Sequence, residues 1–581
     1  GGQLSTAAAI PIIHAGVISG SGSLTKSGAG TIALAGVNTY TGDTLVRQGT
    51  LRFDGNVLNG AASILGNSTS AVIVGDDVGS NSTALLAGTS AALTFARDIT
   101  VVGNASQGTS TVTIGSATGS GGVAYTGTVT LNRSVVLSNA GASGSQISFG
   151  KITGTGGVTI GGGGLTVFTS TASDFTGTVT IGTAGVGTGI LSIGSDALLG
   201  SSGNAIVLNG GTLQVTGSSP WSTARSITLG ASGVFTTSVI DVENTDAVSG
   251  FTITSPITGG GTLRKVGPGI LTFSGTNTYS SGTLVEAGTL RVTAANVLSP
   301  NSSLSVSNGA TVKLNGFSQT VTGLTNPSGT TGGTIDLGSS AGTILTINQT
   351  TFSTPYPNFT GAITGTGDVV KTGLSTQQLG GTSSYLGTTT VRQGILELTN
   401  FVPSSGNGPL GNSAGGAIRL GDANFSDLDA VLFNADKSIN GFGRPITVVA
   451  GSGTRTIGHQ LNTSASDGST VTFSGPITLE KDLQIFTKND ISHGARFQIS
   501  GVVSGTGGLV KLGAGQATLA ADNTYTGTTT VLNGQLIIGG QGLPDAAARS
   551  SSGFRVQADY RDFVGASFNP IPFLAGIVTP E

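Results

Sequence analysis

The sequence contains no cysteine and no methionine, only one tryptophan, and few charged side chains (9%). The absence of cysteine excludes disulfides and thiolate metal sites. The net charge is −3 without a block of basic residues, which argues against nucleic acid or an anionic membrane surface as a partner. No apolar run reaches the ~18 residues that a membrane-spanning helix requires. The sequence therefore predicts neither a membrane span nor a cofactor.

Proline is also scarce relative to glycine (16 against 99) and no Gly-X-Y period is present, which excludes collagen. Low charge with a mean hydropathy of +0.24 is unlike a disordered chain. We therefore expect an ordered protein built from strands. Because methionine is missing even at position 1, we expect the chain to begin after removal of an initiator and a signal peptide.

What the sequence does contain is a 34-residue motif written four times, from Gly20, Gly259, Gly365 and Gly505. We call these the first to fourth copies. Each places a lysine fourteen residues before a tyrosine, in the pairs Lys26 and Tyr40, Lys265 and Tyr279, Lys371 and Tyr385, and Lys511 and Tyr525. Self-similarity of this kind is typical of a solenoid, whose units bury their apolar faces only by stacking.

A fifth, weaker copy starts at Gly154, where Ile160 replaces the lysine and Phe175 replaces the tyrosine one residue late.

Apolar residues in the motif fall in short alternating pairs, as in strands with one buried face. In the first copy Ile32 and Leu34 form one pair, and Leu51 and Phe53 form another 19 residues later. A coil of 19 to 22 residues would place Leu51 over Ile32 and Phe53 over Leu34. The sequence thus predicts an all-β fold, a parallel β-helix (β-solenoid) forming a single elongated rod with a distinct C-terminal tail.

The recurring polar residues admit structural and functional interpretations. Asn38, Asn277 and Asn523 occupy one equivalent position, with Ser383 in the third copy, and we interpret them as turn residues, with an inward-facing stack of amides as the other possibility. The four lysines could form a basic stripe. The favoured interpretation is structural: an apolar stem over the coil edge, with the ammonium group bonding turn carbonyls.

The whole string, from G-x-G-x-L-x-K through N-T-Y-T-G-x-T-x-V to G-x-L, resembles the passenger-associated transport repeat, also called the autotransporter-associated β-strand repeat. This resemblance implies a secreted, surface-displayed, right-handed β-helix. Members of the family often end in a membrane barrel, and nothing here alternates over enough length to form one. The expectation is therefore a released passenger or a surface protein that uses the repeat without a barrel.

The predicted organisation has three parts. Residues 1–18 form an N-terminal lead-in strand, 19–543 a continuous β-helix, and 544–581 a C-terminal cap or assembly tail. The marked repeats lie near 20–53, 154–193, 259–292, 365–398 and 505–538. Apolar side chains near the two ends are candidate assembly contacts: Ile10, Ile12, Ile13, Phe554, Phe563, Phe568 and Phe573.

Motifs for chemistry are weak. Gly411 to Gly415 reads G-x-S-x-G, but no helix follows and the composition accounts for the match. The three histidines His14, His459 and His493 lack zinc-site spacing. Two loop clusters are better explained as solvated surface charge than as a calcium site or a polysaccharide-cleaving group. The first is Asp422, Asn424, Asp427 and Asp429, and the second is Asp482, Lys488, Asp490, His493 and Arg496.

These observations predict a non-catalytic extracellular structural protein on the bacterial cell surface. It would be a subunit of a fibre that assembles head-to-tail, or an adhesin. Its partners would be other copies of itself, surface glycans, or host or abiotic surfaces. The alternative is a carbohydrate-binding or polysaccharide-degrading passenger, for which Trp221 and Tyr560 are the candidate stacking residues.

Overall fold

The computed structural model describes residues 1–7, 10–77, 79–88, 91–103, 110–117, 122–141, 144–182, 189–230, 237–243, 250–327, 330–351, 355–400, 402–403, 405–424, 428–434, 440–459, 470–488, 496–539 and 554–557. It divides into two compact units, Gly1–Asp336 and Leu337–Glu581. Within the described residues the secondary structure is β throughout, apart from one 3₁₀ turn, η1 (Asp196–Leu199). None of the described segments contains a helix of the length and apolarity needed to cross a bilayer.

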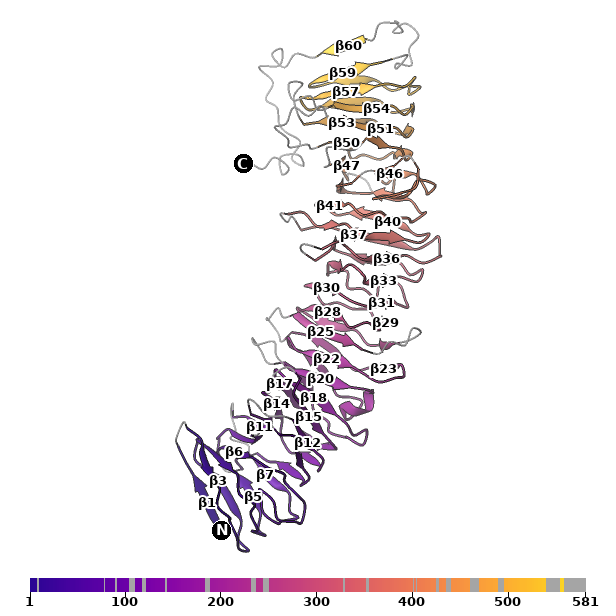
Figure 1. Ribbon diagram of the computed structural model, residues 1–581. Coiled ribbons are helices and arrows are strands. Elements are labelled where there is room, and N and C mark those ends of the chain that lie inside the picture. Colours follow the sequence, from indigo (N-terminus) through magenta and orange to yellow (C-terminus); the bar gives the residue numbers. More distant parts are fainter. Residues whose placement is uncertain are drawn as a thin grey trace. The chain divides into compact units, whose positions relative to one another are not determined.

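Sheets of stacked parallel strands build the first unit (Figure 1). The first sheet contains β1 (Gly2–Ser5), β3 (Leu24–Ser27), β5 (Thr44–Val46), β7 (Val72–Val74), β10 (Ile99–Val101), β13 (Val129–Leu131) and β16 (Ile152–Gly154). The second contains β2 (Ile12–His14), β4 (Thr31–Leu34), β6 (Gly49–Phe53), β8 (Thr83–Ala87), β11 (Val112–Ser116), β14 (Val135–Asn139), β17 (Val158–Gly162), β19 (Val179–Ile181), β21 (Ile206–Leu208), β24 (Ile227–Leu229) and β27 (Ile257–Gly259).

The third sheet contains β9 (Leu93–Phe95), β12 (Val123–Tyr125), β15 (Gln146–Phe149), β18 (Leu165–Phe168), β20 (Ile190–Ile193), β22 (Thr212–Val215), β25 (Thr237–Val242), β28 (Thr262–Val266), β30 (Gly282–Val285), β32 (Leu304–Val306) and β35 (Leu324–Thr325). A fourth contains β23 (Trp221–Thr223), β26 (Phe251–Ile253), β29 (Ile270–Phe273), β31 (Thr289–Val292), β33 (Thr311–Lys313) and β36 (Thr334–Asp336), and β34 (Gln319–Val321) follows β33 in the chain.

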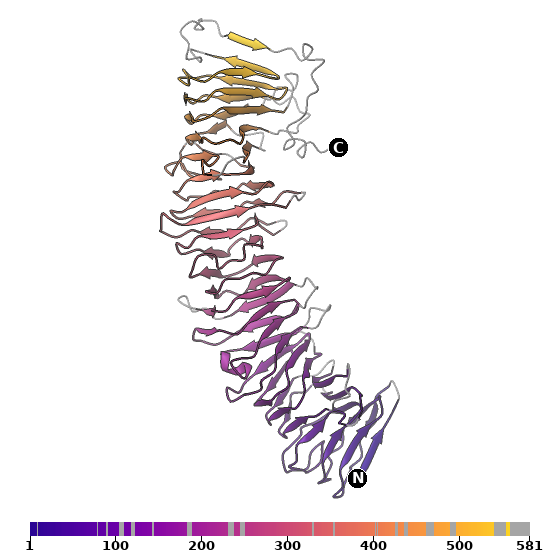
Figure 2. The ribbon, with the colours of Figure 1, turned by 180° about the vertical axis from the view of Figure 1, so that it is seen from behind.

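The second unit has the same construction, as Figure 2 shows from behind. One sheet contains β37 (Ile344–Asn348), β40 (Asp368–Thr372), β42 (Thr389–Val391), β46 (Ile418–Leu420), β49 (Ile446–Val448), β52 (Ile477–Leu479) and β55 (Val503–Gly505). Another contains β38 (Asn358–Phe359), β41 (Thr376–Leu379), β43 (Gly394–Leu398), β47 (Ala430–Asn434), β50 (Arg455–His459), β53 (Leu483–Thr487), β56 (Leu509–Leu512) and β58 (Thr529–Val531).

The last sheet contains β48 (Asn440–Phe442), β51 (Thr470–Phe473), β54 (Arg496–Ile499), β57 (Gln516–Leu519), β59 (Gln535–Ile538) and β60 (Phe554–Gln557). The remaining strands are β39 (Ala362–Thr364) and the short hairpin of β44 (Asn407–Gly408) and β45 (Gly411–Asn412).

Strand register confirms the predicted parallel β-helix. Ile32 lies beside Leu51 and Leu34 beside Phe53, both in parallel strands. The predicted coil length of 19 to 22 residues is correct inside the copies but wrong between them. There the chain uses three strands a turn, as in β10, β11 and β12, and the bond from the Thr128 amide to Asp98 spans 30 residues. Inside a copy, a turn without a strand replaces the third side and shortens the coil.

The core is a column of stacked side chains, because alternate strand residues point inward. Aromatic rings continue from coil to coil in the first unit, with centroids of Phe95 and Tyr125 5.3 Å apart and those of Tyr125 and Phe149 4.7 Å apart. The register pairs these rings directly. Contacts of this kind add about 0.5–1.5 kcal/mol a pair beyond the buried area.

The predicted assembly residues lie near the two ends of the described chain. Ile10, Ile12 and Ile13 are 78%, 49% and 62% exposed, next to or on β2. At the other end β60 pairs antiparallel with β59 (Figure 1), so part of the tail covers the edge of the last parallel strand. Phe554 begins β60, whereas Phe563, Phe568 and Phe573 lie outside the described residues.

Candidate functional site: the lysine–tyrosine coil

The lysines of the four copies point into the interior of the coil. Lys371 is 1% exposed. Its Nζ donates to the carbonyl oxygens of Thr372 (2.7 Å), Gly373 (2.7 Å) and Gln393 (3.2 Å). The other copies use carbonyls at the same offsets: Lys26 with Ser27, Gly28 and Gln48, Lys265 with Val266, Gly267 and Ala287, and Lys511 with Leu512, Gly513 and Asn533.

The ammonium group thus bonds turn carbonyls, as the favoured interpretation held. The expectation that the stem lies over the coil edge is wrong. Lys26 stands two residues after Leu24 in β3, so strand alternation turns both side chains inward. The interior accepts the charge because three carbonyls match the three donors of an ammonium group. A basic stripe is excluded in the described chain, because all four lysines are at most 1% exposed.

Burial lowers the pKa of all four lysines: to about 8 for Lys26 and Lys265, and to about 7 for Lys371 and Lys511. The charges of Asp241 and nearby Glu243 act in the opposite direction only on Lys265. Since the carbonyl contacts also favour the charged form, each lysine balances desolvation against three hydrogen bonds.

Each tyrosine closes the opposite end of the same strand pair. The Tyr385 hydroxyl is hydrogen-bonded to Thr389 Oγ1 (2.6 Å), at the start of β42, and is fully buried. Lys371 bonds the carbonyl just after β42. The fourteen-residue spacing is therefore the path from the end of one strand, around the turn, to the start of its neighbour. The same Tyr–Thr bond occurs at Tyr40, Tyr279 and Tyr525.

The asparagine position joins neighbouring coils. Asn277 accepts a hydrogen bond from the Ile257 amide (2.7 Å) and donates to the Val297 carbonyl (2.6 Å). Its side chain is 1% exposed. Asn38 and Asn523 accept equivalent bonds from Ile18 and Val503, and Ser383 accepts one from Ile363. The residues are turn residues, as predicted, and their amides bond backbone groups of the adjacent coils.

A leucine–glycine turn packs on the tyrosine from the next coil. Gly411 has φ +89°, and a Cβ there would lie 2.5 Å from the Tyr385 carbonyl oxygen. Gly66 has the same relation to Tyr40. In the second copy Ser299 replaces the glycine, and its hydroxyl donates to the Tyr279 carbonyl (2.5 Å). The weaker copy follows the pattern, because Gly200 packs on the Phe175 ring, so Phe175 does take the tyrosine's place.

A second recurring motif, R-x-I-T, was missed in the sequence. Its arginines are 1% to 3% exposed, and each guanidinium bonds backbone carbonyls from the preceding coil. Arg97 Nη1 donates to Leu65 (2.8 Å) and Arg97 Nε to Ser70 (3.0 Å). The signal was present as three strings, Arg97 to Thr100, Arg225 to Thr228 and Arg444 to Thr447. It was hidden because the strings stand 50 or more residues after the tyrosine position.

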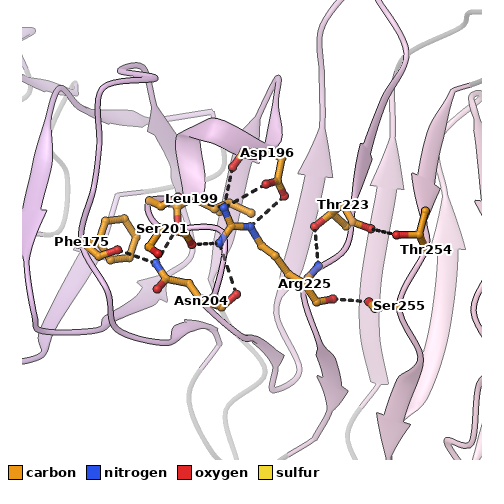
Figure 3. A network of polar contacts seen from close by, with 10 residues as sticks. Phe175, Asp196, Leu199, Ser201, Asn204, Thr223, Arg225, Thr254 and Ser255 are labelled. Carbon is orange, nitrogen blue, oxygen red and sulfur yellow. Dashed lines mark hydrogen bonds and ion pairs between the residues drawn. The ribbon is translucent and has the colours of Figure 1, made fainter.

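Figure 3 shows this contact at Arg225 in the weaker copy. The guanidinium donates to both carboxylate oxygens of Asp196 (2.9 and 3.1 Å) and to the Gly200 carbonyl (3.0 Å). Asn204 Nδ2 in turn donates to the Phe175 carbonyl (2.8 Å). The 3₁₀ turn is thereby tied to the coils on both sides. In the second copy Gln319 takes the arginine's place and accepts from the Val297 and Leu298 amides.

The predicted chemical groups are engaged in structural contacts where the chain is described. Ser413 Oγ accepts from the Gly406 amide (2.8 Å) after the hairpin. Asp422 is paired with Arg392 (2.9 Å), and Asp429 accepts from the Thr454 amide (2.7 Å). Asn424 donates its backbone amide to Asp422. Asp427 lies outside the described residues.

The second cluster is only partly described. Asp482 Oδ1 accepts from the Gly508 amide (2.6 Å), and Lys488 is exposed. Asp490 and His493 lie outside the described residues, and only the backbone of Arg496 is described. Convergence of these residues therefore stays a prediction. In the described part of the chain no group of three or more histidine and acidic side chains is placed to hold a metal ion.

The remaining candidate residues stand in separate places. His14 lies in β2, beside Leu34, whereas His459 is buried in β50 with its ring 6.1 Å from Phe497. Burial lowers the pKa of His459 to about 4, and nearby Lys511 adds to this. Trp221 starts its sheet in β23 and packs on Phe251 at 4.5 Å.

Tyr560 lies outside the described residues.

The motif has known relatives. Residues 24–53, 263–292, 369–398 and 509–538 match the family described as the Passenger-associated-transport-repeat. Over 228 residues (38% of the chain) the sequence is 38% identical to an adhesin autotransporter, BmaC, of Brucella suis biovar 1 (strain 1330). Over 40 residues (7%) it is 68% identical to an extracellular serine protease of Serratia marcescens. No solved structure matches the chain.

These relatives are much longer than the matched regions. The chain covers 6% of the Brucella adhesin and 4% of the Serratia protease. A further match, 28% identical over 285 residues, is an uncharacterized lipoprotein, YdeK, of Escherichia coli (strain K12), of which it covers 20%. The similarity to the protease is confined to a length of about one repeat, whereas the similarity to the adhesin extends well beyond one.

Proposed function

We propose that this chain, an autotransporter-passenger-type protein with four passenger-associated transport repeats, is an adhesive β-helical region displayed on the bacterial cell surface. The observation that carries this proposal is the 38% identity to an adhesin autotransporter over 228 residues. A stretch of that length includes more than one repeat together with the coils between them. The similarity therefore concerns the architecture as a whole and not one motif.

The physical character of the coil supports a scaffold role. Its charged interior groups are saturated by backbone carbonyls, so they stabilise turns and leave no reactive group facing solvent. Solenoids grow by adding coils and offer long side surfaces to partners. A passenger of this kind presents contact surfaces at a distance from the cell, and it needs no catalytic residue to do so.

A bead assay tests the adhesive function. The full chain is coupled to fluorescent beads, which are offered to cultured epithelial cells and to immobilised matrix proteins. We expect retention that soluble chain competes away and that beads carrying heat-denatured chain lose. Equal retention of native and denatured beads on every surface would reject the proposal.

We also propose, as a finer possibility, that copies of the chain assemble head-to-tail. The support is the exposed apolar group Ile10, Ile12 and Ile13 near the edge strands β1 and β2. Edge strands with apolar neighbours recruit further strands, and a heterologous contact that does not close yields a filament. Electron micrographs and light scattering of the wild type should then show filaments that replacement of the three isoleucines by serine removes. A monodisperse wild type would end this idea.

Deletion of residues 554–581 separates two roles of the tail. Loss of filaments would mean that the tail is the docking element. Stronger assembly would mean that it is a cap, because the deletion uncovers the edge of β59.

The enzymatic alternative requires cleavage of a polysaccharide by the group that includes Asp482. We propose that the chain is not an enzyme, on the strength of its adhesin relative. Reducing-end assays on a panel of neutral and acidic polysaccharides test this directly. Any turnover that Asp482→Asn abolishes, while circular dichroism remains unchanged, would reverse the assignment.

A further inference from the structure

We propose that a groove on the outer face of β6, β8 and β11 binds a neutral polysaccharide. This inference rests on the proposed adhesive function and adds the chemical class of the partner. The groove is a cavity of about 460 Å³, and its lining includes Gln48, Thr50, Asn81, Ala84, Thr111 and Thr113.

The floor of the groove is one row of outward-facing residues. Thr50, Ala84 and Thr113 are consecutive partners in the parallel register of the three strands. They face outward because their neighbours Leu85 and Ile114 are buried in the coil. Parallel strands repeat about every 4.8 Å, a distance comparable to the length of one pyranose residue. The floor is therefore a regular row of hydroxyl and methyl groups.

The walls are held by buried polar contacts. The Asp76 carboxylate is buried and accepts hydrogen bonds from the Gly79 amide (2.8 Å) and from the Asn81 side chain (2.5 Å). On another side, the carbonyl of Gln48 is bonded from within the coil by Lys26 (2.8 Å). Both walls are thus fixed before a ligand arrives, which reduces the ordering entropy lost on binding.

The chemistry of the lining selects the ligand class. None of the residues that line the cavity carries a charge, and all of them belong to the described chain. Hydroxyl and amide side chains such as Thr113 and Asn81 both donate and accept hydrogen bonds, as sugar hydroxyls do. The methyl groups of Ala84 and the threonines offer a small apolar surface to the C–H face of a sugar ring. An anionic polymer would instead require basic side chains.

A peptide strand fits this place poorly. β8 is paired on one side with β6 and on the other with β11, so it has no free edge for an added strand. The outer row continues through Val136 to Thr159 and Thr180 on the same sheet. A polymer that enters the groove can therefore extend along the row, which favours a polysaccharide chain over a single sugar.

The test uses the full chain and immobilised polysaccharides. Neutral probes are dextran, laminarin and mannan, and anionic probes are heparin and alginate, measured by biolayer interferometry. Ala84→Tyr fills the groove. The double variant Thr50→Val with Thr113→Val removes two hydroxyls while it preserves shape, which keeps the test valid if the larger substitution disturbs folding. Thr180→Tyr is the matched control, because it lies on the same outer row but does not line the cavity.

We expect at least one neutral polysaccharide to bind the wild type and the control equally, and both groove variants to bind it at least tenfold more weakly. Binding confined to anionic probes, no binding to any neutral probe, or equal binding by the groove variants would overturn the proposal. The bead assay separates the two claims. Cell adhesion that persists in Ala84→Tyr rejects the groove and leaves the adhesive function standing, whereas groove binding without cell adhesion does the reverse.

Discussion

Replacement of Lys371 by methionine tests whether the repeat depends on a buried, partly neutral lysine. Methionine has a similar length, so the change removes the ammonium group and its three carbonyl contacts with little change in volume. Burial lowers the pKa of Lys371 from its ordinary value of 10.5 to about 7. Between these values the unfolded chain binds a proton that the folded chain has lost, so the stability of the wild type rises with pH.

The size of the effect follows from the same linkage. One proton of difference corresponds to about 1.4 kcal/mol per pH unit. From pH 7.5 to pH 10 the wild type should therefore gain up to about 3 kcal/mol relative to Lys371→Met. The carbonyl contacts favour the charged form and make this an upper bound. Tyr385, whose pKa burial raises to about 12, is present in both proteins, so its contribution cancels in the difference.

The assay is equilibrium unfolding in guanidinium chloride, followed by far-ultraviolet circular dichroism at several pH values. Because repeat proteins need not unfold in a two-state manner, the comparison rests on midpoints, whose separation should change by on the order of 0.5–1 M. The control is Lys313→Met, since Lys313 is exposed at the end of β33. A separation between wild type and Lys371→Met that does not change with pH would refute the reasoning.

Three further outcomes are expected. Arg225→Met should destabilise its coil by about 3–5 kcal/mol, because it leaves a carboxylate without its cation; hydrogen exchange should show faster exchange around the 3₁₀ turn, and Arg264→Met, at a 40% exposed side chain, should not. Gly411→Ala should destabilise the third copy by about 1–3 kcal/mol, because φ is +89° and a Cβ would meet backbone; Gly203→Ala, with open space around it, should leave proteolysis rates unchanged. Because burial lowers the pKa of His459 from 6.5 to about 4, stability should fall as pH falls from about 6.5 to 4, since the unfolded chain takes up the proton first; His459→Phe should flatten the thermal midpoint over that range, and an unchanged slope would contradict the assignment.

Much of the fold could be predicted because strand alternation and copy spacing are local properties of a sequence. The spacing of Ile32 and Leu51 already implied that one coil lies on the next, and the register confirms it. The turn role of Asn277 followed from its neighbours in the motif and is also observed. These features depend on residues within one coil, so a single repeat contains the information.

The candidate site was less accessible to sequence reasoning. The side of the coil that Lys26 would take depended on whether three carbonyls, one of them at Gln48, would converge on its ammonium group. The contacts of Arg97 depended on a turn 27 to 32 residues earlier in the chain. Neither acceptor set has a sequence signature, because backbone carbonyls belong to every residue type.

The sequence by itself determined that the chain is a parallel β-helix with a repeated coil, because burial of alternating apolar residues leaves a repeating strand pattern no other way to stack. Only the tertiary structure decided where the polar residues go. It turned Lys371 inward, lengthened the coils between copies, and placed Arg225 against the turn of the coil before it. The physical reason is that a buried charge is stable only where enough acceptors meet, and that meeting is a property of stacked coils and not of any one of them.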